Sequence, residues 1–295
     1  MTEFLQLSFD GLALGARYAL VALGFVMVYR ATGVINFAQG GLLALGAYLA
    51  YAFNTVAPFA VAVVLALIAT ATVGAGFERV VLRRMVGQPA FAVIMITIGL
   101  LFVIEQLVTA VWGFEAINLG DPWGLQTVGA GDLVLAERNL WTLGLTAAAL
   151  AVFFLAFRYS KIGVAMRAAA FDQEAALAQG ISAGRVQGLS WALAGAMGAL
   201  AGVTLAAGPA ALEPTIGAVA LVAFPAIILG GLDSPGGAVV GGLLIGFVQA
   251  MTVGYQRDIF PDLANLSTVM PYVVMVLILL VRPYGLFGTK EVHRI

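Results

Sequence analysis

The sequence lacks the side chains on which most catalytic and metal-binding sites depend. Among its 295 residues there is no cysteine, and His293 is the only histidine. These absences exclude disulfides, thiolate nucleophiles and cysteine-ligated metals, and they leave imidazole chemistry almost no material. The sequence also contains no G-x-x-x-x-G-K-[ST] motif, so we expect no P-loop nucleotide site and no other cofactor in this chain.

The sequence also contains few charged residues. Charged residues make up 10% of the chain and hydrophobic residues 62%, and the mean hydropathy is +1.04. Soluble domains average about 25% charged and about 45–50% apolar residues, so this chain has too little polar surface to cover an exterior in water. The composition excludes a soluble enzyme, a nucleic-acid-binding protein and a disordered tail. Because the strands of a membrane barrel would alternate polar and apolar residues, we expect an all-α, polytopic helical membrane protein with a single transmembrane domain over residues 1–295.

A helix needs about 20 residues to cross a bilayer, and nine apolar segments have about this length or slightly less. The second segment is the candidate for a broken or re-entrant helix, so we expect eight to nine crossings. The polar stretches between the segments are short, except for 113–138 and 158–186. The nine segments are 9–29, 32–53, 57–77, 91–112, 139–157, 187–207, 215–230, 237–255 and 268–282.

The basic residues predict how the chain is oriented. Eleven of the 14 Lys and Arg residues fall on one side of the membrane if the N-terminus is outside. The positive-inside rule therefore predicts an external N-terminus and a cytoplasmic C-terminus. With this orientation, 113–138 is an external loop and 158–186 is cytoplasmic. The opening MTEFLQLSFD has no basic n-region, so we expect the first apolar segment to be retained.

The cytoplasmic loop 158–186 carries the most informative motif. Residues 164–179 favour a helix, Gly180 is a good helix stop, and Ser182 suits the N-cap of the next helix. The stretch 174–180 reads E-A-A-x-x-x-G, which is typical of the coupling loops of bacterial ABC importer permeases. A short helix of this kind presents small residues to a groove of a partner ATPase. An ordinary solvated connector is the alternative. The candidate coupling residues are Arg167, Asp172, Glu174, Ala175, Ala176 and Gly180.

Four ordered stretches then resemble one transporter family. Residues 11–40, GLALGARYALVALGFVMVYRATGVINFAQG, are similar to the opening of the branched-chain amino acid permease family, and 159–182, 223–246 and 279–288 agree in order. The short loop with R-A-A-A-x-D, from Arg167 to Asp172, resembles the H-type subunit of that family. Arg17 departs from the pattern, since many relatives carry a small polar residue there.

The resemblance implies a permease subunit of an ATP-driven importer in a bacterial inner (cytoplasmic) membrane. Such a subunit would pair with a second permease, as a homodimer or heterodimer, and would work with two cytoplasmic ATPases that bind the ATP and with an extracytoplasmic substrate-binding protein. It would contact membrane lipid and no nucleic acid, and it would not be an enzyme itself. The expected substrate is a branched-chain amino acid or a related small polar solute. Urea, short amides or aromatic acids are alternatives, and a proton-coupled secondary transporter is a different class.

Polar residues inside spans are the candidates for the translocation pathway, because such residues are costly in a membrane and usually face an interior. They are Arg17, Asn36, Phe37, Gln39, Glu105 and Gln106. Glycines around Asn36 and Gln39 predict a broken helix that exposes polar groups at membrane depth. Hydrogen bonding between helices by the two amides is an equal alternative. Glu105 and Arg17 are the only opposite charges placed inside spans, so they either pair or Glu105 lines the pathway alone.

Overall fold

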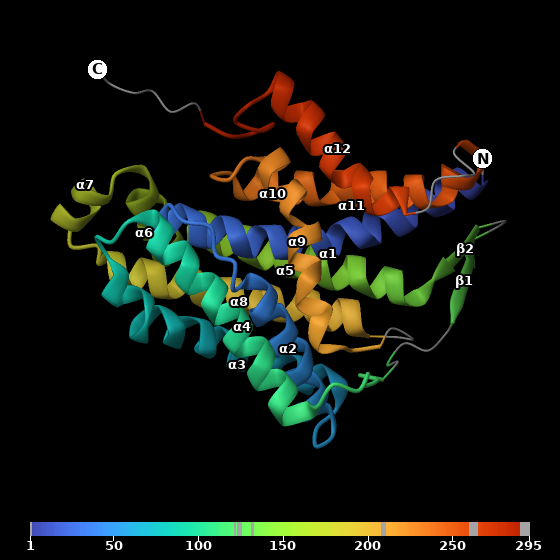
Figure 1. The fold of residues 1–295 in the computed structure, drawn as a ribbon, viewed down its shortest axis with the longest axis horizontal. Helices are drawn as coiled ribbons and strands as arrows, with labels where there is room; N and C mark the ends of the chain where they lie inside the picture. The colour runs from blue at the N-terminus through green and yellow to red at the C-terminus, as the bar shows by residue number, and fades with distance from the viewer. Residues whose placement is uncertain are drawn as a thin grey trace.

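The computed structural model describes residues 2–120, 122, 126–130, 133–207, 211–259 and 265–289. They form helices and one short hairpin (Figure 1), which confirms the predicted all-α membrane fold. The long helices are α1 (Thr2–Thr32), α3 (Phe59–Val80), α4 (Ala90–Trp112), α5 (Glu137–Tyr159), α8 (Ala183–Ala206) and α11 (Pro235–Ile259). The shorter elements are α2 (Gln39–Asn54), η1 (Leu82–Met85), β1 (Thr127–Ala130), β2 (Leu133–Ala136), α6 (Lys161–Phe171), α7 (Gln173–Ala178), η2 (Pro214–Ala218), α9 (Val219–Val222), α10 (Phe224–Gly230) and α12 (Leu266–Val281).

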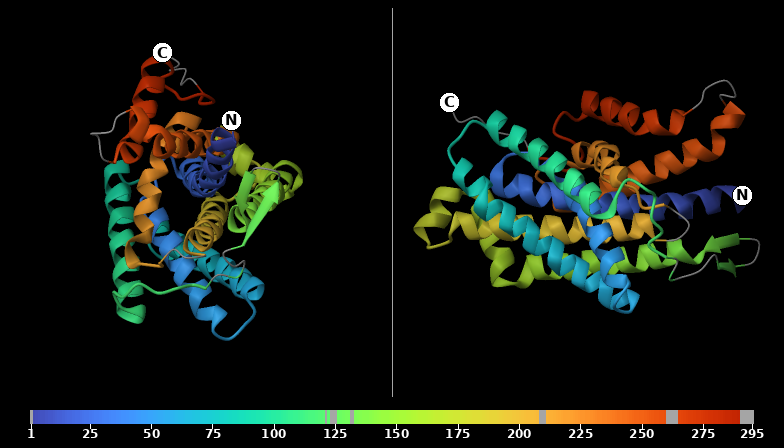
Figure 2. Two further views of the ribbon diagram at one scale, coloured as in Figure 1. Left: turned by 90° about the vertical axis from the view of Figure 1, so that its right-hand side faces the viewer. Right: turned by 60° about the horizontal axis from the view of Figure 1, so that its bottom comes forward.

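Helix α1 is the central element of the bundle. It packs against α11, α8, α5 and α10, and the view along the bundle shows it surrounded by other helices (Figure 2). Nearly all of its residues from Gly11 to Val28 are buried. A helix that is apolar on every side must be covered on every side. Its 31 residues extend about 46 Å, which exceeds the about 30 Å of a bilayer's hydrocarbon core.

Glycines set how closely α1 approaches α11. A Cβ built on Gly15 would lie 2.6 Å from the Cα of Leu243, and one built on Gly246 would lie 2.1 Å from the backbone nitrogen of Gly15. No side chain fits at either position without moving a backbone. The pairs Gly11/Gly15 and Gly242/Gly246, each four residues apart, therefore serve close helix packing, as such pairs do in other membrane bundles.

Among the described residues, six helices are long and apolar enough to cross a membrane. They are Thr2–Thr32, Phe59–Met85, Ala90–Trp112, Glu137–Tyr159, Ala183–Ala206 and Pro235–Gln256. The other three predicted segments are shorter or interrupted: 32–53 contains the 16-residue α2, 215–230 is divided among η2, α9 and α10, and 268–282 is the 16-residue α12. The predicted break in the second segment is present. The total of eight or nine crossings stays a prediction.

The two long polar stretches lie at opposite ends of the bundle. The antiparallel hairpin β1–β2, which pairs Thr127 with Ala136 and Val128 with Leu135, lies beside the start of α1 (Figure 1). Helices α6 and α7 lie at the other end, where α6 contacts α1. This arrangement is the one that a loop on each side of a membrane requires.

Candidate functional site

The segment 33–38 interrupts the helical run between α1 and α2. Gly33 ends α1 with a φ of +70°, and its backbone nitrogen donates to the carbonyl of Tyr29 at 2.7 Å. Asn36 is fully buried, and its Oδ1 accepts a hydrogen bond from the backbone nitrogen of Ala38 at 3.0 Å. The backbone nitrogen of Phe37 donates to Oγ1 of Thr97 in α4 at 3.2 Å. Side chains thus satisfy two of the backbone groups that a break in a membrane helix leaves free.

Gln39 fastens the start of α2 to α8. Its Nε2 donates to the carbonyl oxygen of Ala194 at 3.0 Å, and its side chain is fully buried. A Cβ on Gly24 would lie 2.4 Å from this Nε2, and one on Gly198 would lie 3.0 Å away. Two glycines therefore leave the space that the amide occupies. Of the two roles that the sequence left open for Gln39, this geometry favours the hydrogen bond between helices.

Phe37 connects the broken segment to α10. Its ring stacks on Phe224 with centroids 6.1 Å apart and an interplanar angle of 22°. Phe25 of α1 meets the same ring edge-on at 6.2 Å. These aromatic contacts stabilise the position of the segment between α1 and α10.

A cavity of about 320 Å³ lies next to the broken segment. Its walls come from the end of α1, from α3 and η1, from the start of α4, and from α8, and Gln173 of α7 reaches it. Asn36 and Trp191 are among its lining residues, and each has a fully buried donor without a hydrogen-bond partner, Nδ2 of Asn36 and Nε1 of Trp191. Gln39 likewise has one buried polar atom without a hydrogen-bond partner, its Oε1.

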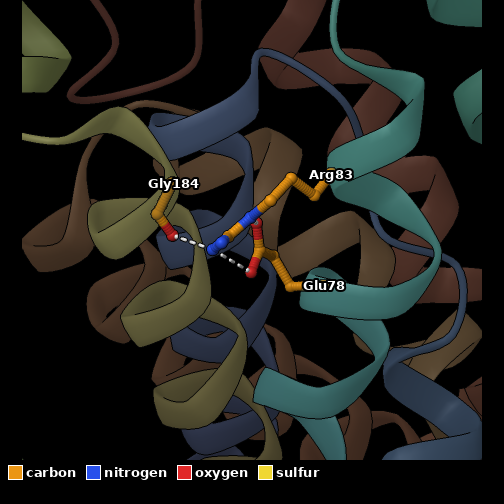
Figure 3. A network of polar contacts seen from close by, with 3 residues as sticks. All are labelled: Glu78, Arg83 and Gly184. Atoms are coloured by element: carbon orange, nitrogen blue, oxygen red, sulfur yellow. Dashed lines mark hydrogen bonds and ion pairs between the residues drawn. The ribbon is translucent and has the colours of Figure 1, made fainter.

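Glu78, which lines this cavity, forms an ion pair with Arg83 (Figure 3). The Glu78 side chain is 2% exposed, and Arg83 donates to its two oxygens through Nε at 3.2 Å and Nη2 at 3.0 Å. The same Nη2 donates to the carbonyl of Gly184 at 2.9 Å, which ties the end of α3 to the first turn of α8. The sequence analysis missed this pair, because the apolar run ends at 77 while the helix continues to Val80. The spacing of five residues between Glu78 and Arg83 is the feature of the sequence that could have predicted the pair.

The predicted coupling helix over 164–179 is two helices in the structure. α6 ends at Phe171, and Asp172 begins α7 by accepting a hydrogen bond from the backbone nitrogen of Ala175 at 2.9 Å. Helix propensity predicted a single helix over this stretch. Asp172 is an N-cap, and that role was not recognised from the sequence. The predicted stop at Gly180 is confirmed, with a φ of +80°.

The α7 region presents part of the predicted coupling set outward. Glu174 and Ala175 are exposed, and the preceding Phe171 is 95% exposed. Ala176, by contrast, is only 4% exposed, so it faces the chain itself. Arg167 also turns inward: it donates to the carbonyls of Phe157 and Arg158, and its guanidinium lies over the Phe157 ring. Sequence reasoning missed Phe171, whose exposure depends on the break at Asp172.

The hypothesis that Arg17 pairs with Glu105 is wrong. Arg17 lies between α1 and α5, where its Nη2 donates to Oγ1 of Thr142 at 3.4 Å. Glu105 lies on α4, and its Oε1 is 3.4 Å from a Cβ built on Gly217 of η2. The two side chains, both among the described residues, form no ion pair. Hydropathy gives the depth of a residue and not its neighbours, which is why the pairing could not be judged from the sequence.

The structure brings the six pathway candidates only partly together. Asn36 and Phe37 lie in the broken segment, and Gln39 begins α2. Glu105 lies nearby across Gly217, since a Cβ on Gly217 would be 2.7 Å from the carbonyl oxygen of Gly40 and 3.4 Å from Oε1 of Glu105. Gln106 is exposed on the outer face of α4, and Arg17 lies on the other side of α1. The role of all six residues in a translocation pathway stays a prediction.

Long apolar helices around a buried central helix, with a broken segment between α1 and α2, are the architecture of a multi-pass helical membrane protein. The chain belongs to the family described as branched-chain amino acid transport system / permease component, whose model matches residues 7–279. This result confirms the family that the four sequence stretches resemble.

Relatives in this family match along almost the entire chain. The high-affinity branched-chain amino acid transport system permease protein LivH of Escherichia coli is 30% identical over 99% of this chain and 98% of its own length. BraD of Pseudomonas aeruginosa, with the same description, is 28% identical over 99% of this chain and 98% of its own. The galactofuranose transporter permease protein YtfT of Escherichia coli is 27% identical over 92% and 78%.

Proposed function

We propose that this chain is the membrane-spanning permease subunit of an ATP-binding-cassette importer for branched-chain amino acids. The observation that carries the proposal is the full-length similarity to LivH and BraD, both named as branched-chain amino acid permeases. The similarity to a galactofuranose permease shows that related sequences carry other solutes, so the substrate needs its own test. Urea, short amides and aromatic acids are the other solutes that we weigh.

In this proposal, α7 contacts a partner ATPase. Phe171, Glu174 and Leu177 are exposed around this short helix, at the end of the bundle that carries the basic residues. Exposed large apolar groups beside a charge are typical of a surface that a partner covers. The complete transporter would contain two such ATPases, which bind the ATP, a second permease and an extracytoplasmic binding protein. The N-terminus would be outside the cell and the C-terminus in the cytoplasm.

The test is transport by the complete complex in proteoliposomes. Uptake of L-leucine, L-isoleucine, L-valine, urea, acetamide and benzoate is measured with and without ATP and the binding protein. We expect the three amino acids to accumulate only when ATP and the binding protein are both present. Uptake of leucine driven by a pH gradient without ATP would contradict the proposal and would favour a proton-coupled transporter.

A further inference from the structure

A groove of about 260 Å³ lies between α6 and the start of α8, and it shares no residue with the cavity beside the broken segment. Lys161 of α6 and Arg185 of α8 line it, and none of the described residues around it is acidic. Both cations are exposed, and within the described chain neither side chain has an ion pair or a hydrogen bond. Ser182 also lines the groove, and its hydroxyl makes no cap hydrogen bond to α8. The groove therefore collects positive charge that nothing in the described chain neutralises.

The position of the groove along the bundle is where two candidate membrane spans end. The span of α5 ends at Tyr159, two residues before Lys161, and the span of α8 begins at Ala183, two residues before Arg185. Tyr159 is 71% exposed, and tyrosine is enriched where a span meets the lipid headgroups. Lys161 and Arg185 are therefore at the depth of the headgroups, whichever way the chain is oriented in the membrane.

The rest of the groove is apolar. Met166 and Val186 contribute buried surface, and Ile162 and Leu189 are 52% and 37% exposed. A soluble phosphate would use only the cations, whereas a phospholipid would also place the first part of its acyl chains on the aliphatic residues. Basic pockets between spans at a membrane surface are typical binding sites for anionic headgroups. The charge and the apolar lining together favour a lipid over a soluble anion.

We propose that this groove binds the headgroup of one anionic phospholipid. Its phosphate lies between Lys161 and Arg185 and accepts hydrogen bonds from both side chains and from the hydroxyl of Ser182. Its acyl chains leave the groove over Ile162 and Leu189 and enter the bilayer. Because α6 leads directly into α7, a lipid bound here fastens the segment that carries α7 to α8. The proposal does not depend on which solute the chain transports.

The test is native mass spectrometry of the purified full-length chain in detergent, titrated with dioleoylphosphatidylglycerol. We expect one lipid to bind more tightly than any further lipid. The double variant Lys161→Gln, Arg185→Gln should bind this lipid about tenfold or more weakly, because each basic residue at a membrane surface contributes to the attraction of an anionic lipid. The matched control is Arg79→Gln, Arg84→Gln, which removes two exposed basic residues outside the groove. This control should bind the lipid as the unmodified chain does.

Two further ligands separate the headgroup charge from the acyl chains. Dioleoylphosphatidylcholine has the same acyl chains and no net charge, and glycerol 3-phosphate has the phosphate and no acyl chains. Each should bind at least about tenfold more weakly than phosphatidylglycerol. Equal binding of the choline lipid would overturn the choice of an anionic headgroup. Equal binding of glycerol 3-phosphate would assign the groove to a soluble anion and would overturn the choice of a lipid.

The double variant at Lys161 and Arg185 tests the place of the site. If it binds phosphatidylglycerol as tightly as the unmodified chain does, the lipid site is elsewhere and the proposal is wrong. An acidic segment of a partner protein is the competing occupant. If the variant loses the ATPase subunits during size-exclusion chromatography of the complete transporter and still binds the lipid normally, the groove belongs to that partner and the proposal is overturned. The three ligands compared on the unmodified chain keep the proposal testable even if the double variant does not fold.

Discussion

At the scale of single residues, Glu78 shows how the chain holds a buried charge. Its carboxylate is buried and is stabilised by two hydrogen bonds from Arg83, whose own side chain is 44% exposed. Removing one partner of a buried pair leaves an uncompensated charge, which is more damaging than removing both partners.

We expect Arg83→Met to lower the thermal stability of the purified permease. A fully buried pair costs about 3–5 kcal/mol to break, and the partial exposure of Arg83 should reduce that cost. The double variant Glu78→Gln, Arg83→Met should recover part of the loss. Arg84→Met is the control, because Arg84 is an exposed neighbour in η1. The measurement is the melting temperature by size-exclusion chromatography, and equal melting of Arg83→Met and Arg84→Met would contradict a stabilising pair.

At the scale of elements, the crossing of α1 and α11 depends on glycine. The two backbones approach until a Cβ on Gly15 would lie 2.6 Å from the Cα of Leu243 and 2.9 Å from the carbonyl oxygen of Gly242. The atoms in the way are backbone atoms, which cannot rotate aside. A larger residue at Gly15 therefore fits only if the two helices move apart.

Gly15→Ala should consequently destabilise the folded chain by about 1–3 kcal/mol, as overpacking does in other cores. Gly76→Ala in α3 is the matched control, because a Cβ at Gly76 meets nothing within 4 Å. We expect the control to be neutral or slightly stabilising, since alanine favours helix more than glycine does. The yield of folded protein after extraction, together with the melting temperature, checks both variants. A tolerated Gly15→Ala would show that α1 and α11 separate more easily than this packing implies.

Local sequence signals predicted some elements and failed for others, for physical reasons. The break after Gly33 and the stop at Gly180 were predictable because a glycine at positive φ ends a helix by itself. The split at Asp172 was missed because the surrounding alanines all favour one helix. The inward positions of Ala176 and Arg167 depend on how α6 and α7 fold back on the bundle, which no local pattern records.

At the scale of the whole molecule, the absence of cysteine makes the orientation easy to test. Each cysteine introduced into the chain is the only one present. Thr127→Cys places it in the hairpin beside the start of α1, and Glu174→Cys places it on α7 at the other end. Both positions are exposed.

A membrane-impermeant maleimide added to intact cells should label Thr127→Cys, because the positive-inside rule places the hairpin outside. Glu174→Cys should react only after the membrane is permeabilised. The reverse pattern would invert the orientation, and labelling of both positions in intact cells would contradict a hairpin and an α7 on opposite sides of the membrane.

In the proposed function, α7 couples ATP hydrolysis by a partner to solute movement through this chain. The most direct measurement is the ratio of leucine taken up to ATP hydrolysed, in proteoliposomes containing the complete transporter. Glu174→Lys reverses an exposed charge on α7, which should oppose the partner's complementary charge. Thr127→Lys, an exposed change at the opposite end of the bundle, is the control. We expect Glu174→Lys to lower this ratio at least severalfold at normal expression, with Thr127→Lys unchanged. An unchanged ratio in Glu174→Lys would contradict the coupling role of α7.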